Sequence, residues 1–344
     1  HIVGDLFDRG PRPDRILDSL MAHHQVDIQW GNHDVVWMGA AAGSPLCIMT
    51  VLKTTLAYNN LDTLEGGYGI SLRRLERFAQ HTYADSDVSR WLPHADQRTA
   101  AGDLTAAARM HKAVTVMMLK LEAQVIARNP DFDLQGRDFL NHIDFAAGTV
   151  DYFGTTYPLL DCDFPTVDPA NPAALTADEE KIAAELVRSF AESERVQRHV
   201  QFLYAHGAFY KMCNGNLLYH GAVPMTEDGA FAAIRFEGTA RSGKQLRLVE
   251  KSLPAPGLLR YIGERLGTQR LMSFHQPFLN HDARLFPEAD ILLGKPLPVR
   301  SAQLFYQQHS GPFDPAKQLQ WLIDTPARLQ QYLALAQGLG TRLR

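Results

Sequence analysis

The hydrophobic pattern of residues 1–34 predicts a strand, a helix and a second strand, with a polar cluster after each strand. Short apolar runs at residues 1–3 and 26–30 have the length of buried strands, and residues 13–23 carry apolar side chains at helical spacing. The polar clusters occupy residues 4–10 and 31–34. Turns that follow parallel strands of an open α/β sheet lie side by side at its carboxyl edge, where ligands bind. We therefore expect the two clusters to be neighbours in space.

The pattern after residue 34 is mainly helical. Apolar side chains recur at helical spacing in five segments, residues 35–42, 44–60, 71–81, 99–128 and 176–204. The last segment opens with a capping box, in which Thr176 is followed three residues later by Glu179. The stretch at 129–175 is interrupted by prolines and is expected to form loops. A short apolar run at 216–219 predicts one more strand.

The two polar clusters contain the residue types of a metal-assisted phosphatase. Asp5 and Asn32 offer oxygen ligands suited to Mn²⁺ or Mg²⁺. His33 can transfer a proton, and a carboxylate such as Asp8 would fix its tautomer. Arg9 presents a planar fork that matches a phosphate group. Either cluster alone is typical of a surface turn or a helix cap, but their occurrence after consecutive strands favours phosphoester hydrolysis.

Two later histidines are further candidates. His220 follows the apolar run at 216–219 as the earlier clusters follow theirs, and this placement makes it a third candidate metal ligand, although a single histidine is more often structural. His206 precedes Gly207 on the segment that leads into this region. It is a candidate for substrate contact, and a simple helix terminus is an equally good interpretation.

Composition narrows the class of protein. The chain has 344 residues, enough for two domains or one large domain with an insertion, and 45% of them are hydrophobic. A net charge of −4 without a basic block argues against nucleic-acid binding. The sequence shows neither a membrane-spanning run nor a signal peptide. Three widely spaced cysteines form no disulfide framework, which is typical of a cytoplasmic protein. Because the chain begins at His1 inside a predicted strand, we expect a fragment that lacks its amino-terminal part.

The motifs resemble a known superfamily. Gly-Asp-x-x-Asp-Arg-Gly at 4–10, followed by Gly-Asn-His-Asp at 31–34, resembles the calcineurin-like metallophosphoesterases. The longer strings at 1–14, 27–40 and 215–225 resemble the class III fructose-1,6-bisphosphatases of bacteria. The short motifs specify only the superfamily, whereas the longer strings specify the subfamily. The resemblance covers roughly residues 1 to 269.

This resemblance implies a fold and a division of the chain. The fold would be an α/β calcineurin-like metallophosphoesterase sandwich that carries a large helical insertion. Residues 1–45 would form the first part of the core, 46–205 the mainly helical insertion and 206–269 the second part of the core. Residues 270–344 no longer match, and we expect a divergent or out-of-frame tail.

The resemblance also implies a dinuclear metal site and a substrate. Asp5 would bridge two Mn²⁺ ions, with Mg²⁺ as the alternative, and Asn32 and His220 would ligate one of them. The reaction would convert fructose 1,6-bisphosphate to fructose 6-phosphate and phosphate in gluconeogenesis. The implied partner is therefore a small-molecule sugar bisphosphate. Neither a nucleic acid nor a membrane is expected as a partner, and the protein could form a homo-oligomer.

The catalytic roles follow from the same resemblance. Arg9 would hold the phosphoryl oxygens and His33 would protonate the leaving alkoxide, with Asp8 orienting that imidazole. The upstream Asp-x-His pair and the late Gly-His ligand of the superfamily are not identifiable in this sequence. We therefore expect the 344 residues alone to hold part of the metal site and to show little activity.

Two other functions stay open at this point. A phosphoprotein or nucleotide phosphatase of the same superfamily would use the same chemistry on another substrate, and comparing the sugar bisphosphate with a phosphopeptide would separate them. A scaffold with a degenerate site would lack metal altogether. A metal analysis would distinguish that protein from an enzyme.

Overall fold

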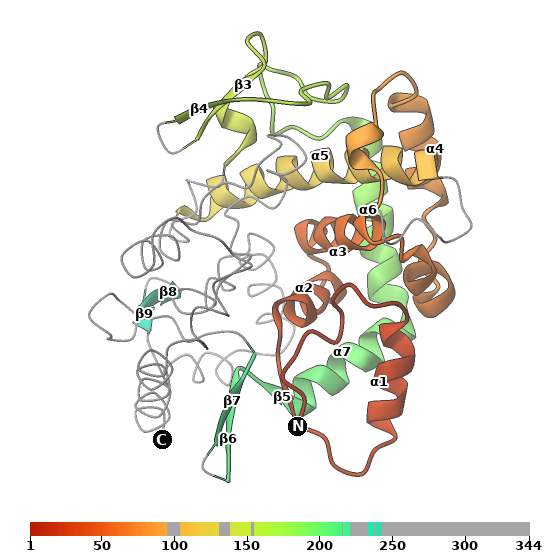
Figure 1. Ribbon diagram of the computed structural model, residues 1–344, viewed down its shortest axis with the longest axis vertical. Coiled ribbons are helices and arrows are strands. Elements are labelled where there is room, and N and C mark those ends of the chain that lie inside the picture. Colours follow the sequence, from red (N-terminus) through yellow and green to blue (C-terminus); the bar gives the residue numbers. More distant parts are fainter. Residues whose placement is uncertain are drawn as a thin grey trace, which may run out of the picture.

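A computed structural model describes residues 1–94, 104–130, 138–152, 155–214, 216–220, 233–236 and 239–241 (Figure 1).

A small parallel sheet brings the first strand segments together. Ile2 bridges Ile28 of β1 (Ile28–Gln29) in parallel, and β1 pairs in parallel with β5 (Gly207–Ala208). The predicted parallel arrangement of the first two segments is confirmed. Both segments are shorter than predicted, because the chain turns sharply after residue 3 and a helix begins at residue 32.

The second polar cluster opens a helix instead of forming a turn. α1 (Pro13–Met21) lies between the two clusters, and α2 (Asn32–Ala41) starts directly after Gly31. The helix predicted at 35–42 therefore begins earlier, and the last three residues of the cluster form its first turn. The amino end of α2, where backbone N–H groups lack intrahelical partners, thus points at the first cluster.

A helical layer fills the space beyond α2. It comprises α3 (Pro45–Ala57), a π-helical turn η1 (Thr63–Gly67), α4 (Arg73–Thr82), a 3₁₀ turn η2 (Ser89–Trp91) and α5 (Leu104–Arg128). α3 packs against both α2 and α5 (Figure 1). Nearly every side chain from residue 106 to residue 126 is buried, so the methionines of α5 fill the core as expected.

The single helix predicted at 176–204 is two helices. α6 (Ala177–Glu192) starts at the predicted capping box, in which Thr176 and Glu179 bond each other's backbone N–H groups. The backbone becomes extended at Ser193, whose hydroxyl accepts the Val196 N–H and donates to the Tyr68 carbonyl. Ser193 therefore ends α6 and caps α7 (Glu194–His206).

The stretch at 129–175 is not purely loop, which corrects the sequence prediction. It contains a 3₁₀ turn η6 (Leu140–His142) and an antiparallel sheet of β2 (Ile143–Asp144), β3 (Thr149–Tyr152) and β4 (Thr155–Pro158). Threonine, valine and tyrosine favour these short strands, and the proline stands at the end of β4, where it interrupts nothing.

The carboxyl-terminal part of the described chain consists of two hairpins. β6 (Tyr210–Cys213) pairs with β7 (Asn216–Tyr219), which confirms the strand predicted before His220, and β8 (Ile234–Phe236) pairs with β9 (Thr239–Arg241). The tail at 270–344 lies outside the described residues, and the division of the chain at 45 and 205 stays a prediction. None of the described helices has the length and apolar character needed to cross a membrane.

Two buried lysines fasten α5 to the first turn of α6 and to the segment before that helix. Lys120 lies 2.8 Å from the carboxylate of Glu179, and both side chains are completely buried. Lys112, also completely buried, lies 2.9 Å from Asp161. A buried lysine requires such a partner, since an unpaired charge in the core is very costly.

Candidate active site

The first cluster begins with a strained turn. Gly4 has φ 93°, and Asp5 has φ 56°, which is rare for a residue with a side chain. A Cβ atom at Gly4 would lie 2.5 Å from both the Gln29 carbonyl oxygen and the Gly31 nitrogen. Only glycine allows the two clusters to approach this closely. The turn therefore presents Asp5 to the amino end of α2.

Asp34 locks the two clusters together, a role that the sequence reading did not assign. Its carboxylate accepts the backbone N–H groups of Asp5 at 2.8 Å, Gly31 at 2.9 Å and Phe7 at 3.2 Å. Burial raises the pKa of Asp34 to about 6, because the nearby negative charge of Asp5 adds to burial and the N–H bonds offset only part of it. The sequence does contain a signal for this role. Asp34 stands three residues after Gly31, and from that position an acidic side chain can bond the backbone N–H groups at the start of a helix.

Asp5 stands between a helix terminus and a histidine. One carboxylate oxygen accepts the His33 backbone N–H at 3.1 Å, and the other lies 3.0 Å from Nε2 of His220. Nδ1 of His220 lies 2.5 Å from the Val3 carbonyl oxygen, so this nitrogen must carry the proton. Burial lowers the pKa of His220, but the hydrogen bond and the charge of Asp5 outweigh burial and raise it overall.

This arrangement of His220 suits a metal ligand. Metal-binding histidines donate one ring N–H to a carbonyl or carboxylate and coordinate through the other nitrogen. In neutral His220, Nε2 would face the Asp5 carboxylate with its lone pair, so a cation between them would relieve the repulsion. The buried carboxylate of Asp34 beside Asp5 adds to the same need for positive charge. The donor set therefore fits a hard or borderline divalent cation.

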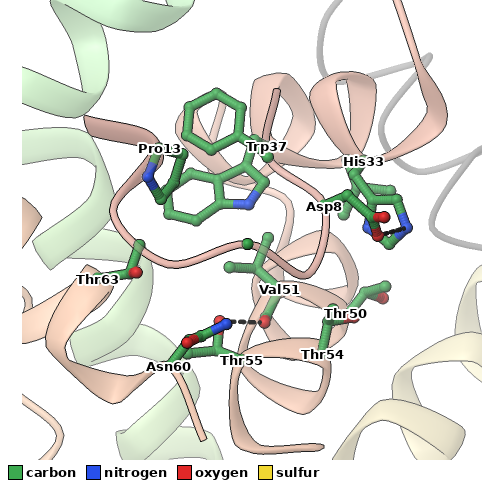
Figure 2. A pocket seen from close by; sticks show the side chains of 13 residues that line it. Asp8, Pro13, His33, Trp37, Thr50, Val51, Thr54, Thr55, Asn60 and Thr63 are labelled. Atoms are coloured by element: carbon green, nitrogen blue, oxygen red, sulfur yellow. Dashed lines mark hydrogen bonds and ion pairs between the residues drawn. The ribbon is translucent and has the colours of Figure 1, made fainter. Parts of the chain in front are cut away.

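His33 and Asp8 form the second pair of the site. Nε2 of His33 lies 2.9 Å from an Asp8 oxygen, the contact drawn as a dashed line in Figure 2. Burial raises the pKa of Asp8, but the hydrogen bond and charge of His33, together with Arg9, lower it overall. Ligand atoms of Asp5, Asp8 and His33 lie within 4.8 Å of one another. The predicted carboxylate–imidazole pair is thus present beside the candidate metal ligands.

The other predicted residues lie at different distances from this centre. Asn32 occupies the first position of α2, between the two residues whose backbone N–H groups reach Asp34 and Asp5. Arg9 lies half exposed, with Nε 3.5 Å from Asp8. His206 is the exposed last residue of α7, and its ring lies against Phe202. Its described contacts do not join it to the cluster, and its role in substrate binding stays a prediction.

A hollow of about 410 Å³, which includes space open to solvent, adjoins the His33–Asp8 pair. One wall is the loop that carries Asp8, and another is α3, which contributes Thr50 and Thr54 (Figure 2). Behind the loop, Phe7 stacks on Trp37 with ring centroids 4.3 Å apart. Both rings also line the hollow, and their stacking supports the loop that carries Asp8.

Comparison with known proteins shows the family of the chain. A family model described as Firmicute fructose-1,6-bisphosphatase matches residues 1–252. The chain belongs to this family. The fructose-1,6-bisphosphatase family match includes both polar clusters and His220, the parts of the chain that converge in the structure.

Curated relatives carry the same family name. The chain is 47% identical over 248 residues to fructose-1,6-bisphosphatase class 3 1 of Clostridium beijerinckii, which covers 72% of this chain and 37% of the relative. It is 47% identical over 248 residues to fructose-1,6-bisphosphatase class 3 of Alkaliphilus metalliredigens, and the aligned region covers 71% of this chain and 37% of the relative. It is 45% identical over 249 residues to fructose-1,6-bisphosphatase class 3 of Bacteroides fragilis, and the aligned region covers 72% of this chain and 38% of the relative. The chain thus spans less than two fifths of the length of these relatives. No solved structure gives a significant match.

Proposed function

We propose that this chain carries part of the active site of a metal-dependent fructose-1,6-bisphosphatase, which hydrolyses fructose 1,6-bisphosphate to fructose 6-phosphate and phosphate in gluconeogenesis. The observation that carries the proposal is the convergence of Asp5, Asp8, His33 and His220 from three separate segments of a chain that belongs to this family.

The metal would be held by Asp5, Asn32 and His220. Two Mn²⁺ ions, with Mg²⁺ as the alternative, would supply Lewis-acid polarisation of the phosphoryl group and an acidified water molecule. The chain's contribution is to fix these donors before substrate arrives. Asp34 fixes the backbone of Asp5, and the Val3 carbonyl fixes the ring of His220.

The remaining side chains act on the substrate directly. Arg9 binds phosphoryl oxygens through its planar fork, and its charge meets the negative charge that spreads over these oxygens in the transition state. His33 gives a proton to the leaving sugar oxygen. Nε2 of His33 lies 2.9 Å from Asp8, so a doubly protonated ring would give its Nδ1 proton to the leaving oxygen and keep the Nε2 proton beside Asp8.

The wider context belongs to the same proposal. We take the fold to be a calcineurin-like metallophosphoesterase sandwich with a helical insertion, acting in the cytoplasm on a small-molecule sugar bisphosphate. The short parallel sheet at the site and the helical layer beyond α2 support this fold. Nothing in the charge of the chain favours a nucleic-acid partner.

The test is phosphate release from fructose 1,6-bisphosphate by a protein of the relatives' length that contains this sequence. We expect Mn²⁺-dependent release that is faster than release from a phosphopeptide or a nucleoside monophosphate. His33→Asn should lower kcat by about 10² to 10⁴, since it removes the general acid. His81→Ala, on an exposed position of α4, is the matched control and should leave kcat unchanged. Faster release from the phosphopeptide would show that the protein is a phosphatase with the same chemistry but another substrate.

A further inference from the structure

Arg9 is held by side chains from the end of α3. Its guanidinium carbon lies 5.3 Å from the centroid of the Tyr58 ring, within the range of a cation–π contact. Its backbone carbonyl accepts a hydrogen bond from the Asn60 side-chain amide at 2.6 Å. One residue thus contacts the charged group of Arg9 and the other fixes the backbone that carries it.

The support itself is well fixed. Tyr58 caps α3, and its backbone N–H donates to the Thr54 carbonyl at 3.1 Å. The chain then turns through Asn59, at φ 55°, so that the Asn60 N–H reaches the Thr55 carbonyl at 2.8 Å. On the side chain of Tyr58, the His94 ring packs with its centroid 4.6 Å away. Hydrogen bonds therefore fix the backbone at Tyr58, and the His94 ring packs against its side chain.

The carboxylate of Asp8 is shared between Arg9 and His33. Its side chain is 51% exposed, and the Asp8 oxygen 3.5 Å from its Nε also lies 2.9 Å from His33. A cation–π contact uses the face of the guanidinium and leaves the N–H groups at its edge to point outward. That orientation suits bidentate binding of an oxyanion.

We propose that Tyr58 and Asn60, together the arginine seat, position Arg9 for phosphate, with Tyr58 as a positioning residue that does not itself touch the substrate. The proposal rests on the proposed function in one respect, the binding of phosphoryl oxygens by Arg9. The new part of the proposal is that the end of α3, which lies outside both polar clusters, sets the affinity of Arg9 for phosphate.

Nuclear magnetic resonance of the Arg9 side chain tests the seat without requiring activity. In the 344-residue chain, the Nε–H signal that disappears in Arg9→Lys should lie upfield of exposed arginines, because protons over a ring face are shielded. Tyr58→Leu should return the signal to the exposed range, and Tyr58→Phe should keep it upfield because the ring remains. A signal in the exposed range in the wild type, or one unmoved in Tyr58→Leu, overturns the seat.

Calorimetric titration of a protein of the relatives' length that contains this sequence, with inorganic phosphate in saturating Mg²⁺, tests the consequence for phosphate binding. Tyr58→Leu should weaken phosphate binding about three- to fivefold, and Tyr58→Phe should restore it to within about twofold of the wild type. Unchanged affinity in a Tyr58→Leu variant whose Arg9 signal has moved overturns the positioning role, as does a wild-type chain that binds no phosphate. Failure of the proposed function is seen separately, as absent sugar-bisphosphate hydrolysis by a protein of the relatives' length, with the Arg9 signal still upfield.

Discussion

The polar clusters and the helical layer are stabilised in opposite ways. In the clusters, two-residue strands and a left-handed aspartate are held by backbone N–H bonds to one buried carboxylate, Asp34. In the helical layer, long apolar faces pack around α5, and the buried charges of Lys112 and Lys120 each have an oppositely charged partner. Closely spaced like charges therefore lie where the proposed chemistry lies, whereas the buried charges of the helical layer are paired with charges of opposite sign.

Loss of the Asp34 carboxylate should have the largest effect on the clusters. Asp34→Ala leaves the backbone N–H groups of Asp5, Phe7 and Gly31 without their acceptor, and we expect a loss of about 4 kcal/mol of unfolding free energy. Urea unfolding measures this loss. Asp34→Asn keeps the size and one acceptor oxygen and should lose clearly less. Equal stability of the alanine variant and the wild type would refute the locking role.

A charge change in the helical layer should destabilise the protein without affecting the site. Lys120→Met leaves Glu179 charged and unpaired in the core, at a cost of about 3 kcal/mol. Adding Glu179→Gln removes that charge while its side-chain oxygen can still accept the Thr176 N–H, so the double variant should recover most of the loss. Denaturation of the two variants gives the comparison, and a double variant as unstable as the single one would contradict it.

The capping box of α6 should contribute less. Thr176→Ala removes the hydroxyl that accepts the Glu179 N–H, and the expected loss is about 1 kcal/mol. Thr176→Ser retains the acceptor and is the control. Thermal unfolding followed by circular dichroism should rank serine with the wild type and alanine below both.

The smallest predicted effect is a dependence on pH at the junction of α1 and α7. Burial lowers the pKa of His199 from 6.5, and the hydrogen bond that its ring donates to Asp18 offsets only part of that lowering. The unfolded chain then binds the proton first, so stability should fall as pH drops below about 6.5. Urea unfolding at pH 7 and pH 5.5 should show a smaller fall in His199→Gln than in the wild type. An identical fall in the two proteins would exclude His199 as its source.

The sequence predicted those features that depend on local periodicity and on strong short motifs. The parallel arrangement of the first segments, the capping box at Thr176 and the proximity of Asp8 to His33 all follow from nearby residues. The break at Ser193 could not be predicted, because the hydrophobic pattern continues through it and the hydroxyl finds its partner, the Tyr68 carbonyl, far away in the sequence.

Long-range contacts also hid two residues of the site. Asp34 was read with its cluster, but its three N–H partners come from both clusters and exist only once these have met. Tyr58 lies about 50 residues from Arg9 and stands at an ordinary helix end, so no motif marks it. The antiparallel strands at 143–158 were missed because each is too short for its alternation to stand out.

The most direct test of the central claim, a shared cation site at Asp5 and His220, is the count of bound Mn²⁺ per polypeptide. It is made by elemental analysis after dialysis, on a protein of the relatives' length that contains this sequence. We predict two ions in the wild type and in His81→Ala, and fewer than one in Asp5→Asn. A wild type without metal, or an Asp5→Asn variant that keeps both ions, would contradict the account.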